Sequence, residues 1–580
     1  MTRSFALLVA FLVLRAQPAT LAAAPGADAA TAAKPTLSTP ASNIPASGSS
    51  AEVNRLLDQV VEREHAFIEG MRGRAPLIET YIQETPSSAG SDGHPDKDHY
   101  FLGRFRLGDN VAYEKLLERT DPAPKAAAKR RGAKAVPMTF LPRGFAQMTV
   151  IDLHEFNRAT YSFDYIRREF LGEVRCLVFD VAPLRRGDPG RFTGRVWIED
   201  RDNNVVRFNG IYTQAPAAKG TAPERYFHFD SWRVNVTPGR WVPAEIYVEE
   251  QALPGAAGNP QGPAGTEGLK AQSRIWDYNP ASANKLAELT GILVDQQSEV
   301  KDATAAQDPS PLESQRSWER QAEENILARL EKGGLLAPPG PVDEVLDTVV
   351  TNLIVSAGLN VDAHCRVLLT TPIETFAIGH TIVISRGLID VLPDEASLAL
   401  VLAAELSHIA LGHPAPTAFA FHNQTMLSDA ELLARFHFAH SVPELTEAGK
   451  KTIEIMRASP YQNTANAGLF LKALAGRGPE LPSLLAANLG NQVANPDALN
   501  RLAEFAASAP PLDENKIEQI AALPLGSRVK LNPWNNRIEL VKTRALTLLS
   551  AREKMPFEVT PFALYLTRVA QVASSAPVQP

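Results

Sequence analysis

A glutamate and a histidine stand three residues apart in the segment LALVLAAELSHIALGH, Leu398–His413. Residues i and i+4 of a helix share one face, so a His-Glu-x-x-His pattern can place two imidazoles on one zinc ion. The glutamate of that pattern takes a proton from the zinc-bound water. Glu405 and His408 fit the pattern, but Ala404 stands where the first histidine belongs. A methyl group cannot coordinate zinc, so the spacing is that of a hydrolytic metal site that lacks one ligand.

The residues around this motif resemble the M48 family of zinc metallopeptidases. The resemblance is carried by TPIETFAIGHTIVISRGLIDVLPDEASLALVLAAELSHIALGH, residues 371–413, which follows the family's order of a strand, a glycine-led strand, a short helix and the motif helix. His413 follows His408 by five residues, as in the family. The motif helix is expected to begin at Asp394 or Glu395. The resemblance implies a mainly helical peptidase domain with a small sheet, a zinc cofactor and a third zinc ligand, a glutamate, on a later helix.

The segment that would carry the third ligand is ELTEAGKKTIEIMRASPY, residues 444–461. Setting Ala448 on the alanine of the family pattern places Leu445 at the ligand glutamate and Gly449 at the supporting aspartate. The resemblance therefore identifies His408 as the sole retained ligand, and the zinc site is interpreted as dismantled. No cofactor is expected, and zinc is expected only if a rearranged ligand set exists. Two glutamates lie near this position, Glu444 and Glu447, and each is expected to point elsewhere on its helix.

Other histidines lie close to the motif in the sequence. They are His413, His422, His437 and His440, and the segment HFAH places the last two at i and i+3. No recognised spacing joins them to His408, so they are interpreted as ordinary surface or core histidines. Glu405 without zinc has no water to activate. It is expected to be a vestigial, satisfied polar residue that is hydrogen-bonded to His408.

The N-terminal half has a different pattern. A helix is predicted to begin near Ala51, and from about Arg175 the apolar residues alternate with period two. Turn residues separate the strand-like runs, and IEDRDNN indicates a hairpin between two of them. The predicted strands are 176–183, 191–200, 205–213, 225–234, 241–250 and 273–279.

This antiparallel sheet resembles the curved sheet of the outer-membrane lipoprotein-sorting carriers, over roughly Glu173–Tyr278. The resemblance rests on VWIEDRDNNVVRFNG and FDSWRVNVTPGRWVPAEIYVEE. An unrelated sheet that packs on its neighbour is the alternative interpretation. Near the C-terminus, apolar alternation around NPWNN predicts a second hairpin within residues 523–542.

The predicted fold class is α+β and multidomain, with the antiparallel sheet domain followed by the M48-like domain. The composition is that of a globular protein, with 44% hydrophobic and 21% charged residues in 580. The predicted boundaries are a signal peptide over 1–24, an Ala/Pro/Ser linker over 25–50, the sheet domain with its leading helix over 51–290, a linker over 291–315, the M48-like domain over 316–572 and a disordered tail over 573–580.

The start of the chain predicts export. Arg3 precedes the apolar run FALLVAFLVL, and a stretch rich in small residues follows, which is the layout of a secretory signal peptide. Cys176 and Cys365 are the two cysteines, and both free thiols and a disulfide are compatible with the sequence. The net charge of −7 does not favour nucleic acid as a partner.

These features predict an exported, periplasmic or secreted M48-like protein that does not span a membrane. The leading interpretation is a non-catalytic pseudopeptidase that holds a polypeptide or an envelope protein in the old cleft. The first alternative is an active zinc metalloendopeptidase with a rearranged ligand set. The second is a lipid or lipoprotein carrier that acts through the N-terminal sheet.

Overall fold

The structure is a computed structural model. The predicted signal peptide and most of the predicted linkers and tail lie outside the described residues, as does His422. The described residues are 50–85, 95, 97–120, 140–185, 189–213, 226–251, 268–279, 311–414, 420, 429–462, 465–478, 481–485, 488–492, 503–513, 525–541, 559 and 564–570.

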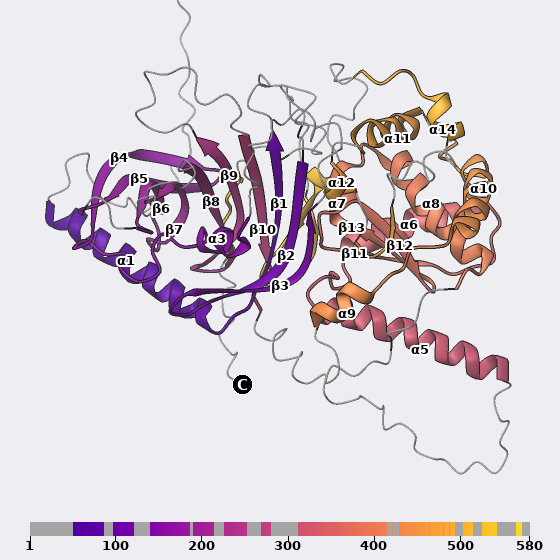
Figure 1. Ribbon diagram of the computed structural model, residues 1–580, viewed down its shortest axis with the longest axis horizontal. Coiled ribbons are helices and arrows are strands. Elements are labelled where there is room, and N and C mark those ends of the chain that lie inside the picture. The colour runs from indigo at the N-terminus through magenta and orange to yellow at the C-terminus, as the bar shows by residue number, and fades with distance from the viewer. Residues whose placement is uncertain are drawn as a thin grey trace, which may run out of the picture. The chain divides into compact units, whose positions relative to one another are not determined.

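The N-terminal region is one sheet with a long helix before it (Figure 1). Its elements are α1 (Ser50–Arg72), β1 (Leu77–Thr85), β2 (Lys97–Leu107), β3 (Val111–Thr120), α3 (Pro142–Gln147), β4 (Tyr161–Leu171), β5 (Val174–Pro183), β6 (Phe192–Glu199), β7 (Val205–Tyr212), β8 (Tyr226–Thr237), β9 (Arg240–Gln251) and β10 (Gly268–Trp276). The strands run antiparallel in the order β3-β2-β1-β10-β9-β8-β7-β6-β5-β4. The predicted helix, strands and hairpin are confirmed, but the prediction missed β1 to β4.

The missed strands do not show the alternation of apolar and polar residues that predicted the others. β4 is an edge strand, and most of its side chains are partly or fully exposed on both faces. In β2 most residues are buried, including the polar side chains of Asp98 and His99. Polar residues are buried in a strand only when they find partners. Here the partners lie in the C-terminal half of the chain or on the neighbouring strand, so the sequence of the strand alone could not indicate its burial.

The C-terminal region is mainly helical and contains a small sheet (Figure 1). Its elements are α5 (Pro311–Lys332), α6 (Pro341–Ser356), β11 (His364–Leu368), β12 (Glu374–Ile378), β13 (Thr381–Ser385), α7 (Arg386–Val391), α8 (Glu395–Leu411), α9 (Asp429–Arg435), α10 (Val442–Ala458), α11 (Ala465–Arg477), α12 (Pro482–Leu485), β14 (Asn491–Gln492), α14 (Ala503–Ser508), η2 (Leu525–Arg528), β15 (Val529–Leu531) and β16 (Ile538–Leu540). The strand order is β11-β13-β12-β14, and β15 pairs with β16 in the predicted hairpin. The α+β fold class is thus confirmed.

Buried carboxylates join the sheet to the helical region. Glu79 on β1 is 2% exposed and accepts hydrogen bonds from the backbone N–H of Thr371 at 2.7 Å and its hydroxyl at 2.6 Å. Asp98 on β2 accepts bonds from the backbone N–H groups of Ser483 and Leu484. Residues of β1, β2 and β10 also share one apolar cluster with the helical region. The two regions therefore form one continuous core.

The end of the described chain returns to the sheet. The backbone N–H of Glu173 donates to the carbonyl of Leu566 at 2.9 Å, and the Arg568 guanidinium lies 2.7 Å from the carboxylate of Glu199. Leu566 is buried in an apolar cluster with residues of β4 to β9. The boundaries predicted from the sequence placed this segment in the M48-like domain. Its contacts lie on the sheet, and the boundaries themselves stay predictions.

Glu79→Ala tests the junction between the two regions. The substitution leaves the Thr371 N–H and the hydroxyls of Thr371 and Tyr100 without an acceptor. We therefore expect the free energy of unfolding to fall by roughly 2–4 kcal/mol. Urea denaturation measures this change. Glu114→Ala, at a site that is 53% exposed on the edge strand β3, is the control and is expected to change stability by less than about 0.5 kcal/mol. Equal effects of the two substitutions would contradict a structural role for Glu79.

Candidate functional site

Helix α8 positions the motif residues. The Asp394 side chain caps its N-terminus by accepting a bond from the N–H of Ser397 at 2.9 Å, which confirms the predicted start. Gly412 ends the helix in the left-handed conformation, with φ of 70°. Between these caps most of the helix is buried, and it packs against α10, α6, α11 and β12. The side chains of α8 therefore point in directions that the core determines.

The zinc set of the motif is incomplete on this helix. Glu405 and His408 are 2% and 3% exposed, and Ala404 is half-buried one turn before His408. On α10, Gly449 is buried and Leu445 is half-buried. The methyl group of Ala404 and the alkyl side chain of Leu445 offer no lone pair. The residues at the positions of the M48-like pattern do not fit a zinc ion, apart from His408.

The carboxylate of Glu405 has a different partner from the one expected. Its Oε1 accepts a bond from the Asn491 side-chain amide at 3.1 Å, and its Oε2 is buried without a hydrogen-bond partner. The expectation that His408 satisfies Glu405 is therefore corrected, because the structure pairs the carboxylate with Asn491. Burial raises the pKa of Glu405 to about 7, and the hydrogen bond from Asn491 only partly opposes this. A carboxyl with this pKa is about half ionised at neutral pH.

A turn that is hydrogen-bonded to Glu374 positions Asn491. The carboxylate of Glu374 on β12 accepts the backbone N–H groups of Asn488, Leu489 and Gly490 at 2.9, 2.7 and 3.1 Å. Asn491 then pairs with Thr375 of β12, as part of strand β14. The turn thus holds the amide of Asn491 against Glu405.

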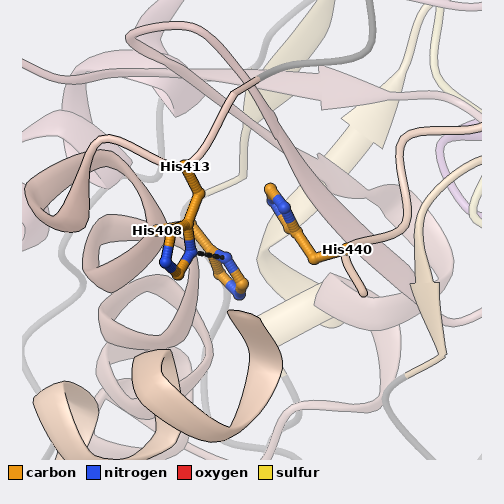
Figure 2. A group of neighbouring side chains, drawn as sticks. All are labelled: His408, His413 and His440. Atoms are coloured by element: carbon orange, nitrogen blue, oxygen red, sulfur yellow. Dashed lines mark hydrogen bonds between the residues drawn. The ribbon is translucent and has the colours of Figure 1, made fainter. Parts of the chain in front are cut away.

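Three histidines meet at the end of α8 (Figure 2). The nitrogen atoms of His408, His413 and His440 that could act as ligands lie within 4.8 Å of one another. His413 and His440, which the sequence analysis interprets as ordinary surface or core histidines, thus lie beside His408. Exposed His437 is not part of this group.

A helix cap brings the first two of these histidines together. The N–H of His413 donates to the carbonyl of His408 at 3.0 Å, across the left-handed Gly412. This wrapped-back C-terminus is the usual form of a helix that ends in glycine. The sequence signal for this cap is Leu-Gly-His at the end of an apolar helix. It predicts only that the chain turns back at His413 toward the end of the helix. His440, which lies before α10, carried no such signal.

The two glutamates of α10 also differ from the expectation. The Glu447 carboxylate lies 3.6 Å from Nε2 of His413, and the Glu444 carboxylate lies 3.8 Å from Nδ1 of His440. Both carboxylates therefore face the histidine group rather than pointing elsewhere. Glu444 also accepts bonds from the backbone N–H and hydroxyl of Ser441, which caps α10. Burial lowers the pKa of His440, although Glu444 opposes the effect.

The cysteines offer no second reactive centre. Cys176 and Cys365 are both free and buried. Burial raises the pKa of the Cys176 thiol to about 12 and that of Cys365 still further. Thiols with such pKa values are protonated at neutral pH and are poor nucleophiles and poor metal ligands.

Residues 342–512 of the helical region match the model of Peptidase family M48. The match includes α8, the histidine group and α10, and it confirms the resemblance seen in the sequence. A search of the curated proteins finds no match.

Solved structures with some similarity were found as well. A LolA superfamily protein from Nitrosomonas europaea is 9% identical, with a TM-score of 0.17, over 38% of this chain and 90% of that chain. A DUF1329 family protein from Desulfovibrio piger is 10% identical, with a TM-score of 0.18, over 38% and 90%. The MucA/MucB complex of Pseudomonas aeruginosa gives 10% identity and a TM-score of 0.12, over 39% and 94%. Similarities at these TM-scores carry no argument about ligands or partners.

Glu405→Gln tests the state of the motif carboxyl. Since the folded pKa of about 7 lies above the usual value of 4.5, ionisation costs free energy in the folded protein only. The natural protein therefore loses stability as pH rises from about 4.5 to 7, and the neutral variant does not. We expect the variant to be more stable at pH 8 by on the order of 3 kcal/mol, with little difference at pH 4.5.

Urea denaturation at the two pH values measures this difference. Glu539→Gln, at an exposed position, is the control and is expected to change neither value. If the natural protein were instead the more stable of the two at pH 8, a cation would have to hold Glu405 ionised, and the neutral state of this carboxyl would be refuted.

Proposed function

We propose that this protein is an M48-like pseudopeptidase that binds polypeptide without zinc-dependent cleavage. The observation that carries the proposal is the surroundings of Glu405. The residue before it, Ala404, offers no ligand, and the Glu405 carboxyl, whose pKa burial raises to about 7, is held by Asn491. A general base must be ionised and within reach of the water it activates. Because Ala404 and Leu445 offer no zinc ligand at the positions of the M48 pattern, Glu405 is expected to have no zinc-bound water within reach.

The pairing of β14 at the edge of the small sheet supports binding of polypeptide. β14 is an extended segment that lies antiparallel on β12, where it pairs with Glu374 and Thr375. This edge of the sheet therefore accepts a backbone in strand form, which is a general mode of peptide binding. In the proposal, an added polypeptide pairs in strand form beside β14, the edge strand of this sheet, so that Asn491 stays on Glu405.

An active zinc metalloendopeptidase with a rearranged ligand set is the second candidate. One observation favours it, namely the position of His413 and His440 beside His408. Three imidazoles and an open position are a ligand set that occurs in catalytic zinc sites. This candidate predicts cleavage that needs both a metal ion and the Glu405 carboxylate, whereas the first predicts no cleavage.

A role as lipid or lipoprotein carrier receives no support from the interior of the N-terminal sheet. Between α1 and β8, Arg233 and Glu64 form a buried pair with two bonds of 2.7 Å, and Arg233 also lies over the Phe67 ring. A described cavity of about 370 Å³ at the sheet is lined by charged groups that include Asp152 and Arg191. Acyl chains bind apolar surfaces, so these features do not favour them.

Export of the chain and binding of an envelope protein belong to this proposal. The support for export is the layout of the first residues of the sequence, which lie outside the described ones. Among the residues that the structure describes, no helix is long and apolar enough to cross a membrane.

The experiment is a binding and cleavage assay with one probe, a fluorescently labelled, reduced and carboxymethylated protein that cannot fold. We expect the anisotropy of the label to rise on addition of the natural protein, and the probe to remain intact by mass spectrometry after prolonged incubation with zinc. The same probe protein in its native, disulfide-bonded form is the control and is expected not to bind.

Two results would overturn the proposal. Cleavage that stops with a chelator and in Glu405→Gln would establish the second candidate. Absence of binding at a large molar excess of the natural protein over the probe would remove the polypeptide as ligand.

A further inference from the structure

The three histidines come from three separate places in the M48-like domain. His408 lies in the last turn of α8, His413 follows the cap residue of that helix, and His440 lies just before α10 (Figure 2). Their side chains are almost fully buried, with exposed fractions of 3%, 9% and 3%. The ring nitrogens of buried histidines this close together need hydrogen bonds to one another or a common ligand.

Each histidine lies with its ring against another of the group. Nδ1 of His408 lies 2.8 Å from Nδ1 of His413 in a hydrogen bond. The rings of His408 and His440 are stacked with centroids 3.7 Å apart. Nε2 of His440 is buried and has no hydrogen-bond partner. A buried nitrogen without a partner is unfavourable, and a ligand can relieve this cost.

The outward nitrogens face carboxylates. Nε2 of His413 faces Glu447, and Nδ1 of His440 faces Glu444. Histidines that bind metals usually present the second ring nitrogen to a carboxylate or a carbonyl, which fixes the tautomer and leaves the other nitrogen unprotonated. Two of the three histidines have a carboxylate on this side, at 3.6 and 3.8 Å, and their other ring nitrogen lies toward the histidine group.

The spacing suits a small cation. Zinc–nitrogen bonds of about 2.0–2.1 Å in a tetrahedral site separate the nitrogens by roughly 3.3 Å. The present separations lie between the 2.8 Å hydrogen bond and the 4.8 Å limit of the group. Rotation of the stacked His440 ring and loss of the proton shared by His408 and His413 would bring the three lone pairs onto one ion.

We propose that His408, His413 and His440 bind one divalent transition-metal ion, with zinc the first candidate. Among the zinc-ligand positions of the M48 pattern, this set includes only His408. It includes neither Glu405 nor the positions of Ala404 and Leu445. Imidazole ligands suit zinc, copper and nickel, whereas magnesium and calcium prefer oxygen. The metal ties the end of α8 to the segment that enters α10.

The inference stands apart from the proposed function, because metal binding is measured without any polypeptide. The test uses the full-length protein, stripped with a chelator and titrated with zinc in a calorimeter at neutral pH. We expect one zinc ion per chain. His413→Ala and His440→Ala are each expected to weaken zinc binding by at least about a hundredfold, since each removes one ligand of three.

His437→Ala is the matched control. It removes an exposed histidine three residues before His440 and is expected to leave the zinc affinity unchanged. Thermal unfolding of the metal-free variants shows whether each one folds. Binding of zinc should raise the melting temperature of the natural protein and of His437→Ala, but not that of His440→Ala.

The outer carboxylate provides a finer test. Glu447→Gln is expected to weaken zinc binding by about tenfold, because outer partners orient the ligand rather than bind the ion. Glu454→Gln, which lies two turns further along α10 and is 67% exposed, is its control. A cobalt-loaded natural protein checks the site without any substitution, since its visible absorption is expected to be that of a four-coordinate ion.

Two results would overturn the inference. One is the absence of stoichiometric zinc and cobalt binding by the natural protein. The other is zinc binding that survives His413→Ala and His440→Ala as well as it survives His437→Ala.

Discussion

The packing of α8 inside the helical region is the constraint on which the candidate site depends. Its apolar residues are buried on several faces, against α10, α6, α11 and β12. A hydroxyl bond of 3.0 Å between Ser407 and Thr452 further joins α8 to α10. These contacts are made by the side chains of the helices and the sheet, and they fix the direction of His408 and Glu405.

Buried carboxylates organise the rest of the molecule through backbone amides. Glu79 and Asp98 bind N–H groups of the helical region from the sheet, and Glu374 binds three N–H groups of the turn before β14. Such hydrogen bonds offset the cost of burying a carboxylate. Glu405 differs from them, because it receives one side-chain amide and no backbone N–H in the described residues. Burial raises the pKa of Glu405 to about 7, so this carboxyl is about half ionised at neutral pH.

The sequence predicted the parts of the fold whose signals are local. The cap at Asp394, the helix from Glu395, the hairpin of β15 and β16 and the strands β5 to β10 follow from periodicity and turn residues. β1 and β2 were missed because their buried polar residues are explained only by partners far along the chain. The absence of ligand groups at Ala404 and Leu445 could also be predicted. The histidine group could not, because His440 reaches it through the packing of α10 on α8, which no spacing in the sequence records.

Anomalous X-ray diffraction at the zinc edge, from crystals grown with zinc, tests most directly whether the metal site of the M48 pattern has been replaced. We expect one strong peak among His408, His413 and His440, and no peak between Ala404 and Leu445 beside Glu405. A peak bound by Glu405 together with His408 would contradict this, because Glu405 would then be an ionised metal-site residue rather than a neutral carboxyl held by Asn491.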